Sequence, residues 1–253
     1  MIDFITELSA MAGAEALRYF GKVTGDDIEC KDVKDLVSVA DKAVENLIIS
    51  KIAERFPDHD IFGEETGHAG KNSEYCWIVD PIDGTQSFVK HHPYFSISIA
   101  LYKNGKGYAG AVNAPALGKL FTAEKGKGAF ENGSPIKVST CSALEEAACA
   151  TGFSLLRFNK VEDPLEKFVR ILPRLRDIKR CGSAALDLSF TAAGIYDGYW
   201  EDGLQLYDVA AGAIIVQEAG GIVNDYTGGS DYPAKGIVAG NSFTAPALTE
   251  LLK

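Results

Sequence analysis

Two stretches near the start of the chain repeat hydrophobic residues at three- and four-residue spacing. The first stretch places its apolar side chains on one helical face: Ile5, Leu8, Ala12, Ala16 and Tyr19. The second does the same: Val44, Ile48, Ile52 and Phe56. This spacing predicts two amphipathic helices, the first ending near Gly21 and the second stopped by Pro57. Asp41 falls in the first turn of the second helix, where the helix dipole favours a carboxylate.

Short apolar runs separated by turn residues follow, a pattern typical of strands. They are Asp60–Gly63, Tyr75–Asp80, Phe95–Tyr102, Gly107–Asn113 and Lys119–Glu124. Asn104-Gly105, between the third and fourth runs, favours a tight hairpin turn. We therefore expect an antiparallel sheet in this part of the chain.

The pattern changes after Lys137 to strands alternating with helices. Helices are expected from Asp163-Pro164, with proline at the first helical position, over Ala184–Ala193, and over Asp208–Ala219 with Asp208 as N-cap. Such alternation usually indicates a mixed or parallel sheet covered by helices. It divides the chain into an N-terminal α+β half, 1–137, and a C-terminal α/β half, 138–253.

Composition narrows the class of protein. The 253 residues are 46% hydrophobic, enough for a large core, yet no apolar run approaches the roughly 18–20 residues that span a bilayer. The start of the chain, Met1–Phe4, carries an acid and no basic segment, so no secretory signal is expected. The five scattered cysteines form no C-x-x-C pair and indicate reduced thiols in a cytoplasmic protein. The net charge of −10, with no basic block, argues against nucleic acid as a partner.

The run Trp77–Thr85 carries the clearest chemistry. A buried apolar strand leads into Asp80 and Asp83, followed by Gly84 and Thr85. Buried carboxylates side by side repel each other until a metal or a proton intervenes. An open glycine backbone and a hydroxyl beside that cation suit a phosphate. The pattern therefore predicts a site that binds divalent metal and phosphate. Bound cations would also make the local charge at this site positive, although the chain as a whole is acidic.

Two other interpretations explain this run less well. The aspartyl-nucleophile phosphatase motif has one residue between its acids, whereas Pro81 and Ile82 separate them here. That motif also usually ends the first strand of a chain. A plain Pro-Asp-Gly turn explains Asp83 but leaves Asp80 unexplained.

Further motifs stand in a familiar order along the whole chain. They are Asp35–Asp41, Gly63-Glu64-Glu65, Arg180–Ala185, Tyr207–Gly212 and Glu218–Gly221. Together with Trp77–Thr85 they resemble the inositol monophosphatase family of metal-dependent, lithium-sensitive phosphatases. The resemblance implies a layered α-β-α-β-α sandwich with the site between its halves, and a homodimer.

The resemblance also implies a metal-ligand set. Glu64, Asp80 and the carbonyl of Ile82 would hold one Mg²⁺, and Asp80, Asp83 and Asp208 a second, with two or three ions per site and Mn²⁺ as a substitute. Most of these ligands lie in the N-terminal half, whereas Asp208 comes from the C-terminal half. Taken alone, Asp208 would be read as a helix cap and Glu64 as part of a solvated turn.

The nucleophile implied by the family is a water molecule. Asp41 and Thr85 match the pair that orients it, with Glu64 assisting, although Thr85 alone could be a turn hydroxyl and Asp41 a first-turn acid. Backbone N–H groups at Gly84 and Thr85 would cradle the phosphate.

Substrate contacts are implied for a further set of residues: Asp83, Gly84, Thr85, Gly182, Ser183, Ala184, Glu201 and Asp208. Glu201 matches the acid that binds substrate hydroxyls, although an exposed strand-end acid is the alternative. Arg180 would meet a second phosphate or lie on the surface, and His91-His92 is assigned no metal.

These residues favour a Mg²⁺-dependent phosphomonoesterase acting on inositol monophosphate or a similar small polyol or sugar phosphate. Fructose-1,6-bisphosphatase, histidinol-phosphatase and 3′-phosphonucleotide phosphatase remain open, as does a non-catalytic regulatory binding protein. Two departures from the family pattern bear on rate and substrate: Gln86-Ser87 replaces Thr-Asn, and Tyr207 replaces a tryptophan.

Overall fold

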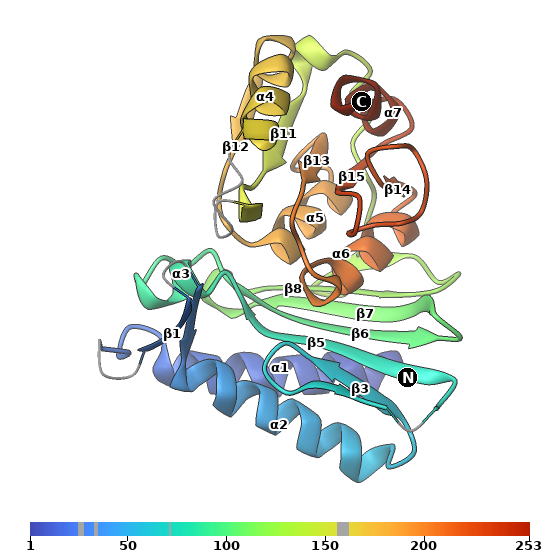
Figure 1. Ribbon diagram of the computed structural model, residues 1–253. Coiled ribbons are helices and arrows are strands. Elements are labelled where there is room, and N and C mark those ends of the chain that lie inside the picture. The colour runs from blue at the N-terminus through green and yellow to red at the C-terminus, as the bar shows by residue number, and fades with distance from the viewer. Residues whose placement is uncertain (25–27, 33–34, 71, 156–161) are drawn as a thin grey trace.

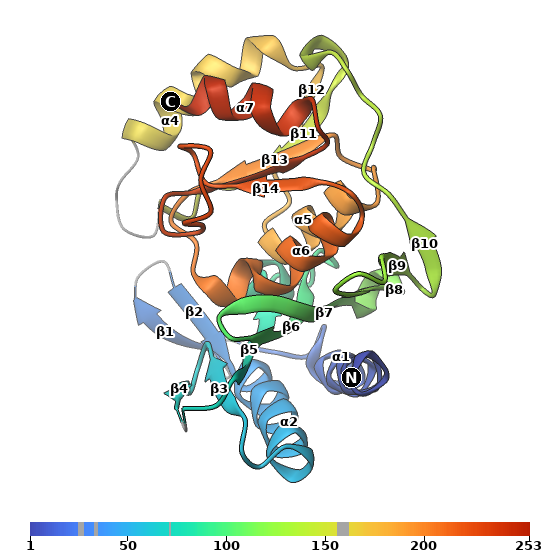
Figure 2. The ribbon, with the colours of Figure 1, turned by 90° about the vertical axis from the view of Figure 1, so that its right-hand side faces the viewer.

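The computed structural model of the chain has five alternating layers of helices and sheets (Figure 1). It describes residues 1–24, 28–32, 35–70, 72–155 and 162–253. Helices α1 (Ile2–Tyr19) and α2 (Val39–Arg55) cover the outer face of a large sheet. Helices α5 (Ala184–Ala192) and α6 (Leu206–Glu218) lie between this sheet and a smaller one, whose other face is covered by α4 (Glu162–Ile171) and α7 (Thr244–Leu252) (Figure 2). The α-β-α-β-α sandwich is confirmed.

The large sheet has eight strands in the described part of the chain. In spatial order they are β10 (Ser134–Ile136), β9 (Ala129–Glu131), β8 (Lys119–Glu124), β7 (Lys106–Ala114), β6 (Ser96–Lys103), β5 (Tyr75–Asp83), β3 (Asp60–Gly63) and β4 (Gly67–Ala69). β6 and β7 form an antiparallel hairpin whose turn is Asn104-Gly105, as expected. A two-stranded ribbon, β1 (Ile28–Asp32) and β2 (Asp35–Ser38), leads into α2.

Two features of the large sheet differ from the expectation. β3 and β5 pair in parallel, so the sheet is mixed rather than antiparallel. The chain between them passes through the short strand β4, which provides the crossover that parallel strands need. β5 also continues past Asp80 to Asp83, because an irregularity in its register with β6 between these residues accommodates Pro81. Both acids therefore belong to one strand end.

The small sheet is mixed, as the alternating pattern predicts. Its spatial order is β12 (Asp177–Lys179), β11 (Ala148–Thr151), β13 (Gly198–Glu201), β15 (Ile237–Gly240) and β14 (Ile222–Asn224). β11 pairs in parallel with both β12 and β13, whereas β15 runs antiparallel to both of its neighbours. α3 (Thr85–Val89) follows β5 directly and begins at the edge of the site.

Three hydrophobic clusters fill the four spaces between the layers, because the largest of them packs on both sides of α5 and α6. The predicted faces of the first two helices are buried, including Ile5 and Ala12 of α1 and Val44 and Ile48 of α2. Helix starts are less accurate, since α4 begins at Glu162 and Pro164 is its third residue rather than its first. Among the described residues, none of the helices is both long and apolar enough to cross a membrane.

Of the five cysteines, four can be described. Cys76, Cys141, Cys149 and Cys181 are free thiols, and the side chain of Cys30 lies outside the described residues.

Candidate active site

The end of β5 buries a carboxylate in an unusual setting. Asp80 is 1% exposed, and none of the described residues donates a hydrogen bond to its Oδ1 atom. Burial raises the pKa of Asp80 well above its ordinary value, and the nearby charges of Glu64, Asp83, Asp208 and Asp41 raise it further. A carboxylate in this position requires either a proton or a cation.

Asp83, at the end of the same strand, is held from the other half of the molecule. Its Oδ2 atom accepts hydrogen bonds from the Ser183 hydroxyl at 2.6 Å and the Ala185 N–H at 2.8 Å. Burial raises the pKa of Asp83 to about 6 despite these two bonds, which act in the opposite direction. Ser183 is also the N-cap of α5, where its hydroxyl accepts from the Leu186 N–H at 3.3 Å.

Asp208 completes a cluster with the two acids of β5. Carboxylate oxygens of Asp80, Asp83 and Asp208 lie within 4.8 Å of one another. The expectation that Asp208 caps its helix as the first residue is wrong. α6 begins at Leu206 with Gln205 as N-cap, and Asp208 is the third helical residue, where its Oδ2 accepts from the Gln205 N–H at 2.6 Å. The Asp208 carboxylate therefore accepts this hydrogen bond and also contributes an oxygen to the cluster.

Glu64 approaches the same cluster from the loop after β3. Its backbone N–H donates to the Val79 carbonyl at 3.1 Å, which attaches the loop to β5 one residue before Asp80. Glu64 is partly buried, and its charge is the largest Coulombic contribution to the raised pKa of Asp80. The structure therefore clusters three of the four carboxylates that the sequence assigned to metal binding, and the charge of the fourth, Glu64, acts on Asp80.

Asp41 and Thr85 form the second predicted group, beside the acids. Asp41 closes a capping box at the start of α2, where its Oδ2 accepts from the Ser38 N–H at 2.8 Å and the Ser38 hydroxyl at 2.6 Å. The Thr85 hydroxyl lies 3.3 Å from Asp41 Oδ1 and 3.1 Å from the Ile82 carbonyl oxygen, so its one proton has two acceptors. Burial raises the pKa of Asp41 to about 6, which leaves it mainly ionised at neutral pH.

Gly84 is required at the turn from β5 into α3. Its φ is +92°, in the left-handed region that side chains disfavour, and an added Cβ would lie 3.0 Å from the Gly182 carbonyl and 3.2 Å from the Tyr94 carbonyl. The absent side chain lets the Gly182–Ala184 segment approach the start of α3. The predicted substrate contacts on the two halves are adjacent for this reason.

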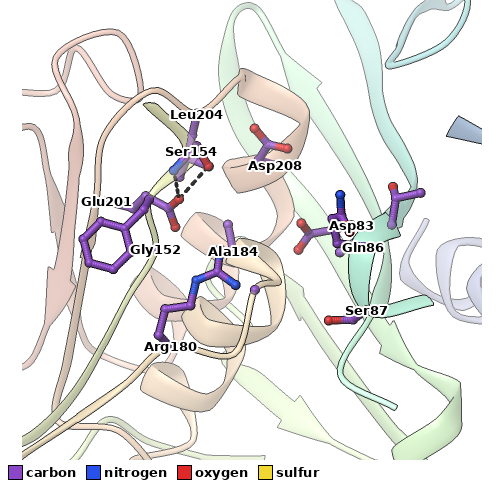
Figure 3. A pocket seen from close by; sticks show the side chains of 14 residues that line it. Asp83, Gln86, Ser87, Gly152, Ser154, Arg180, Ala184, Glu201, Leu204 and Asp208 are labelled. Carbon is purple, nitrogen blue, oxygen red and sulfur yellow. Dashed lines mark hydrogen bonds between the residues drawn. The ribbon is translucent and has the colours of Figure 1, made fainter. Parts of the chain in front are cut away.

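A cavity of about 360 Å³ opens beside the cluster. It is lined by Asp83, Gly84, Thr85, Gln86, Ser87, Gly152, Phe153, Ser154, Arg180, Gly182, Ala184, Glu201, Leu204 and Asp208. Asp83 and Glu201 lie on opposite sides, with Asp208 and Arg180 between them in the view of Figure 3. Arg180 therefore faces the cavity, and its guanidinium is a cation among the carboxylates.

Glu201 is 5% exposed, which excludes the exposed-acid interpretation. Its Oε1 accepts from the Ser154 N–H and hydroxyl at 3.0 and 2.6 Å (Figure 3). Its Oε2 accepts from the Tyr199 hydroxyl at 2.8 Å. Burial raises the pKa of Glu201, and these bonds oppose the rise. A Cβ at Gly152 would lie 2.0 Å from Glu201 Oε2, so a glycine there leaves space for the carboxylate.

Several residues of the site have no assignment from the sequence. Ser154 and Gly152 follow strand β11 and hold Glu201, and only their position after a strand marks them. Ser38 has a local signature, the S-x-x-D capping box. Glu45 stands out as a second acid, besides Asp41, on the buried face of α2, where it is 1% exposed. Its partners lie 20 or more residues away, so no local pattern identifies them.

The fold and this carboxylate cluster define a layered α/β protein whose three clustered acids could hold a metal ion. The chain belongs to the inositol monophosphatase family, which matches residues 1–253. Nus factor SuhB of Pseudomonas aeruginosa is 37% identical, over 98% of this chain and 94% of the relative. Inositol-1-monophosphatase of Mesorhizobium japonicum is 36% identical, over 100% of this chain and 96% of the relative. The crystal structure of extragenic suppressor protein SuhB from Bartonella henselae has a TM-score of 0.94 at 38% identity, covering 99% of this chain and 97% of that one.

Proposed function

We propose that this protein is a Mg²⁺-dependent phosphomonoesterase that hydrolyses inositol monophosphate or a similar small polyol or sugar phosphate. The observation that carries this proposal is Asp80, a buried carboxylate whose Oδ1 lacks a donor among the described residues. It lies within 4.8 Å of two further carboxylates and beside the pair of Thr85 and Asp41. Oxygen-only donors in such a group suit a hard divalent cation.

The residues divide into three roles in this proposal. Glu64, Asp80, Asp83, Asp208 and the carbonyl of Ile82 would hold Mg²⁺, with Mn²⁺ as a substitute. Bound ions of this kind neutralise phosphate charge and make water a better nucleophile. The Thr85 hydroxyl accepts a hydrogen bond from the attacking water and donates its own proton in a hydrogen bond to Asp41, which positions that water.

The cavity supplies the substrate contacts. The N–H groups of Gly84 and Thr85 would bind phosphate oxygens where α3 begins. Glu201 faces the cavity from β13, and its carboxylate would accept from substrate hydroxyls. Arg180 offers a cation to a second phosphate, so bisphosphates belong in the assay beside polyol monophosphates.

The experiment is a phosphate-release panel with four substrates: inositol 1-phosphate, fructose 1,6-bisphosphate, histidinol phosphate and a 3′-phosphonucleotide. Each is assayed with Mg²⁺, with Mn²⁺ and with a chelator. We expect turnover of inositol 1-phosphate with Mg²⁺, none with chelator, and inhibition by submillimolar to millimolar Li⁺. Full turnover in the chelated sample would overturn the metal-dependent mechanism. A strong preference for another substrate would keep the reaction and change the substrate.

The relative named Nus factor SuhB favours a second candidate, a role as a binding protein in a larger complex. An Asp80→Asn variant separates the two roles in the organism that carries the gene. Deletion of the gene is expected to produce a growth defect. If a strain that carries only the variant lacks this defect, the required role is binding and not catalysis.

We also propose that the protein is a cytoplasmic homodimer that does not bind nucleic acid, which sedimentation of the protein alone tests for the dimer. We propose further that the chain divides at 137/138, which limited proteolysis tests.

A further inference from the structure

A carboxylate outside the ligand set is fully engaged just behind the site. Glu45 is 1% exposed and lies on α2 one helical turn after Asp41, on the same face. Its Oε2 accepts from the Glu65 N–H at 2.9 Å. Its Oε1 accepts from the Thr66 N–H at 2.9 Å and the Thr66 hydroxyl at 2.7 Å. Three donors of one short loop therefore converge on a single side chain.

That loop carries Glu64. It leaves β3 after Gly63 and is attached at its other side by the bond from the Glu64 N–H to the Val79 carbonyl at 3.1 Å. The backbone at Glu64 is thus attached to two elements. Its own N–H bonds to β5, and the N–H groups of the next two residues bond to Glu45 of α2. A side chain at Gly63 would disturb the second attachment, since its Cβ would lie 2.3 Å from Glu45 Oε1.

We propose that Glu45 is a positioning residue that fixes the Glu64 loop, so that helix α2 places both the ligand Glu64 and the water-orienting Asp41. This inference rests on the proposed metal-dependent function. The carboxylate is suited to the role because an ionised carboxylate only accepts hydrogen bonds, and all three groups facing it are donors. A glutamine has one accepting oxygen, so its NH₂ group would face either the Glu65 N–H or the Thr66 donors.

The first test is Glu45→Gln, with Mn²⁺ and Mg²⁺ binding measured by calorimetry without substrate. Partners that orient metal ligands typically change metal affinity by about 10–100-fold when substituted, and we expect a weakening on that scale. With metal at saturation the KM for inositol 1-phosphate should change little, because Glu45 is not among the residues that line the cavity. The matched control is Glu54→Gln on the same helix, which removes an exposed carboxylate paired with Lys51.

Removing a negative charge could itself weaken cation binding, so two further variants keep the Glu45 charge. Gly63→Ala displaces the carboxylate by steric contact, and Thr66→Val removes only the hydroxyl donor. We expect weaker metal binding in both, with the smaller effect in Thr66→Val because two N–H bonds remain. Thr66→Ser restores the donor and should restore affinity. Circular dichroism confirms the fold of each variant, and Thr66→Val supplies a mild variant if Glu45→Gln unfolds.

The outcomes separate this inference from the proposed function. If the wild-type protein binds neither Mn²⁺ nor Mg²⁺, the proposed function and this inference both fail. If the wild type binds metal and Gly63→Ala and Thr66→Val bind it equally well, the positioning role is overturned and the metal site stands. Weaker binding in both charge-preserving variants, with recovery in Thr66→Ser, establishes the role.

Discussion

At the scale of single residues, the site is a group of acids whose partners differ. Asp83 has two hydrogen-bond donors and Glu201 has three, whereas Asp80 has an oxygen without one in the described structure. Burying an unpaired charge is costly, and pairing or metal coordination is the usual compensation. Asp83 and Glu201 are therefore stabilised by hydrogen bonds from neighbouring residues, whereas Asp80 requires a cation or a proton.

Thr85→Ala tests the proposed chemical role directly. The change removes the hydroxyl that bonds to Asp41 and Ile82 but none of the proposed carboxylate ligands. We expect kcat to fall by about 10²–10⁴-fold, the usual range for acid–base assistance, with little change in KM. Steady-state kinetics on the best substrate measures this, and metal binding by calorimetry should match the wild type. Wild-type kcat in the variant would remove Thr85 from the mechanism.

Asp187 offers a pH-dependent prediction away from the ligands. It is 1% exposed on α5 and accepts a hydrogen bond from the Tyr94 hydroxyl at 2.6 Å. Burial raises its pKa well above the ordinary value, the charges of Glu201 and Asp83 add to this, and Arg180 opposes it. The folded state therefore keeps a proton that the unfolded chain loses near pH 4, so the stability contributed by this group declines as pH rises from there toward the raised pKa.

Asp187→Asn keeps the acceptor for Tyr94 and removes the titration. The melting temperature of the variant relative to wild type should therefore rise between pH 5 and pH 8, as measured by thermal denaturation of both proteins. Glu201 and Asp83 are buried in both proteins, so only their interaction with the Asp187 charge differs between them. An equal difference at the two pH values would show that Asp187 does not titrate in this range.

At the scale of elements, the sequence predicts those features that depend on residues near one another in the chain, such as the buried face of a helix or a hairpin turn. The buried faces of α1 and α2 follow from their 3.6-residue periodicity, and the β6–β7 turn follows from Asn104-Gly105. The start of α6 is misplaced because a first-turn Asp resembles a cap, and only the geometry assigns capping to Gln205. The parallel pairing of β3 with β5 and the contacts of Glu45 depend on residues far apart in sequence, so no local pattern contains them.

The packing of α6 on the large sheet gives a prediction at this scale. A Cβ at Gly110 of β7 would lie 3.1 Å from the Cα of Ala211, one turn after Asp208. Gly110→Ala should push α6 outward, cost about 1–3 kcal/mol of stability as overpacked cores do, and weaken Mg²⁺ binding by moving Asp208. Chemical denaturation and calorimetry measure the two effects. Ala111→Val, on the opposite face of β7, should affect stability alone; equal metal affinity in both variants would contradict the proposed coupling.

At the scale of the whole molecule, the site is assembled from separate layers. Asp41 comes from an outer helix, Asp80 and Asp83 from the large sheet, and Asp208 from the inner helix layer. No single layer supplies the cluster, so the acids approach one another only when the sandwich is complete. Their mutual repulsion opposes this assembly in a chain of net charge −10.

Divalent metal should therefore stabilise the entire fold. A ligand that binds only the folded state at 100 times its Kd adds about 2.7 kcal/mol, which for a chain of this size raises the melting temperature by about 5–10 °C. Differential scanning calorimetry measures the melting temperature in Mg²⁺ and in NaCl of equal ionic strength with chelator. NaCl should raise the melting temperature little, because charge screening does not replace coordination.

Asp80→Asn removes the central carboxylate and should abolish the Mg²⁺-dependent shift. Its metal-free form should melt at or above the temperature of metal-free wild type, because the variant lacks a carboxyl group that must be buried either charged or with a proton taken up from water. An equal Mg²⁺ shift in Asp80→Asn would place the stabilising ion elsewhere on the molecule.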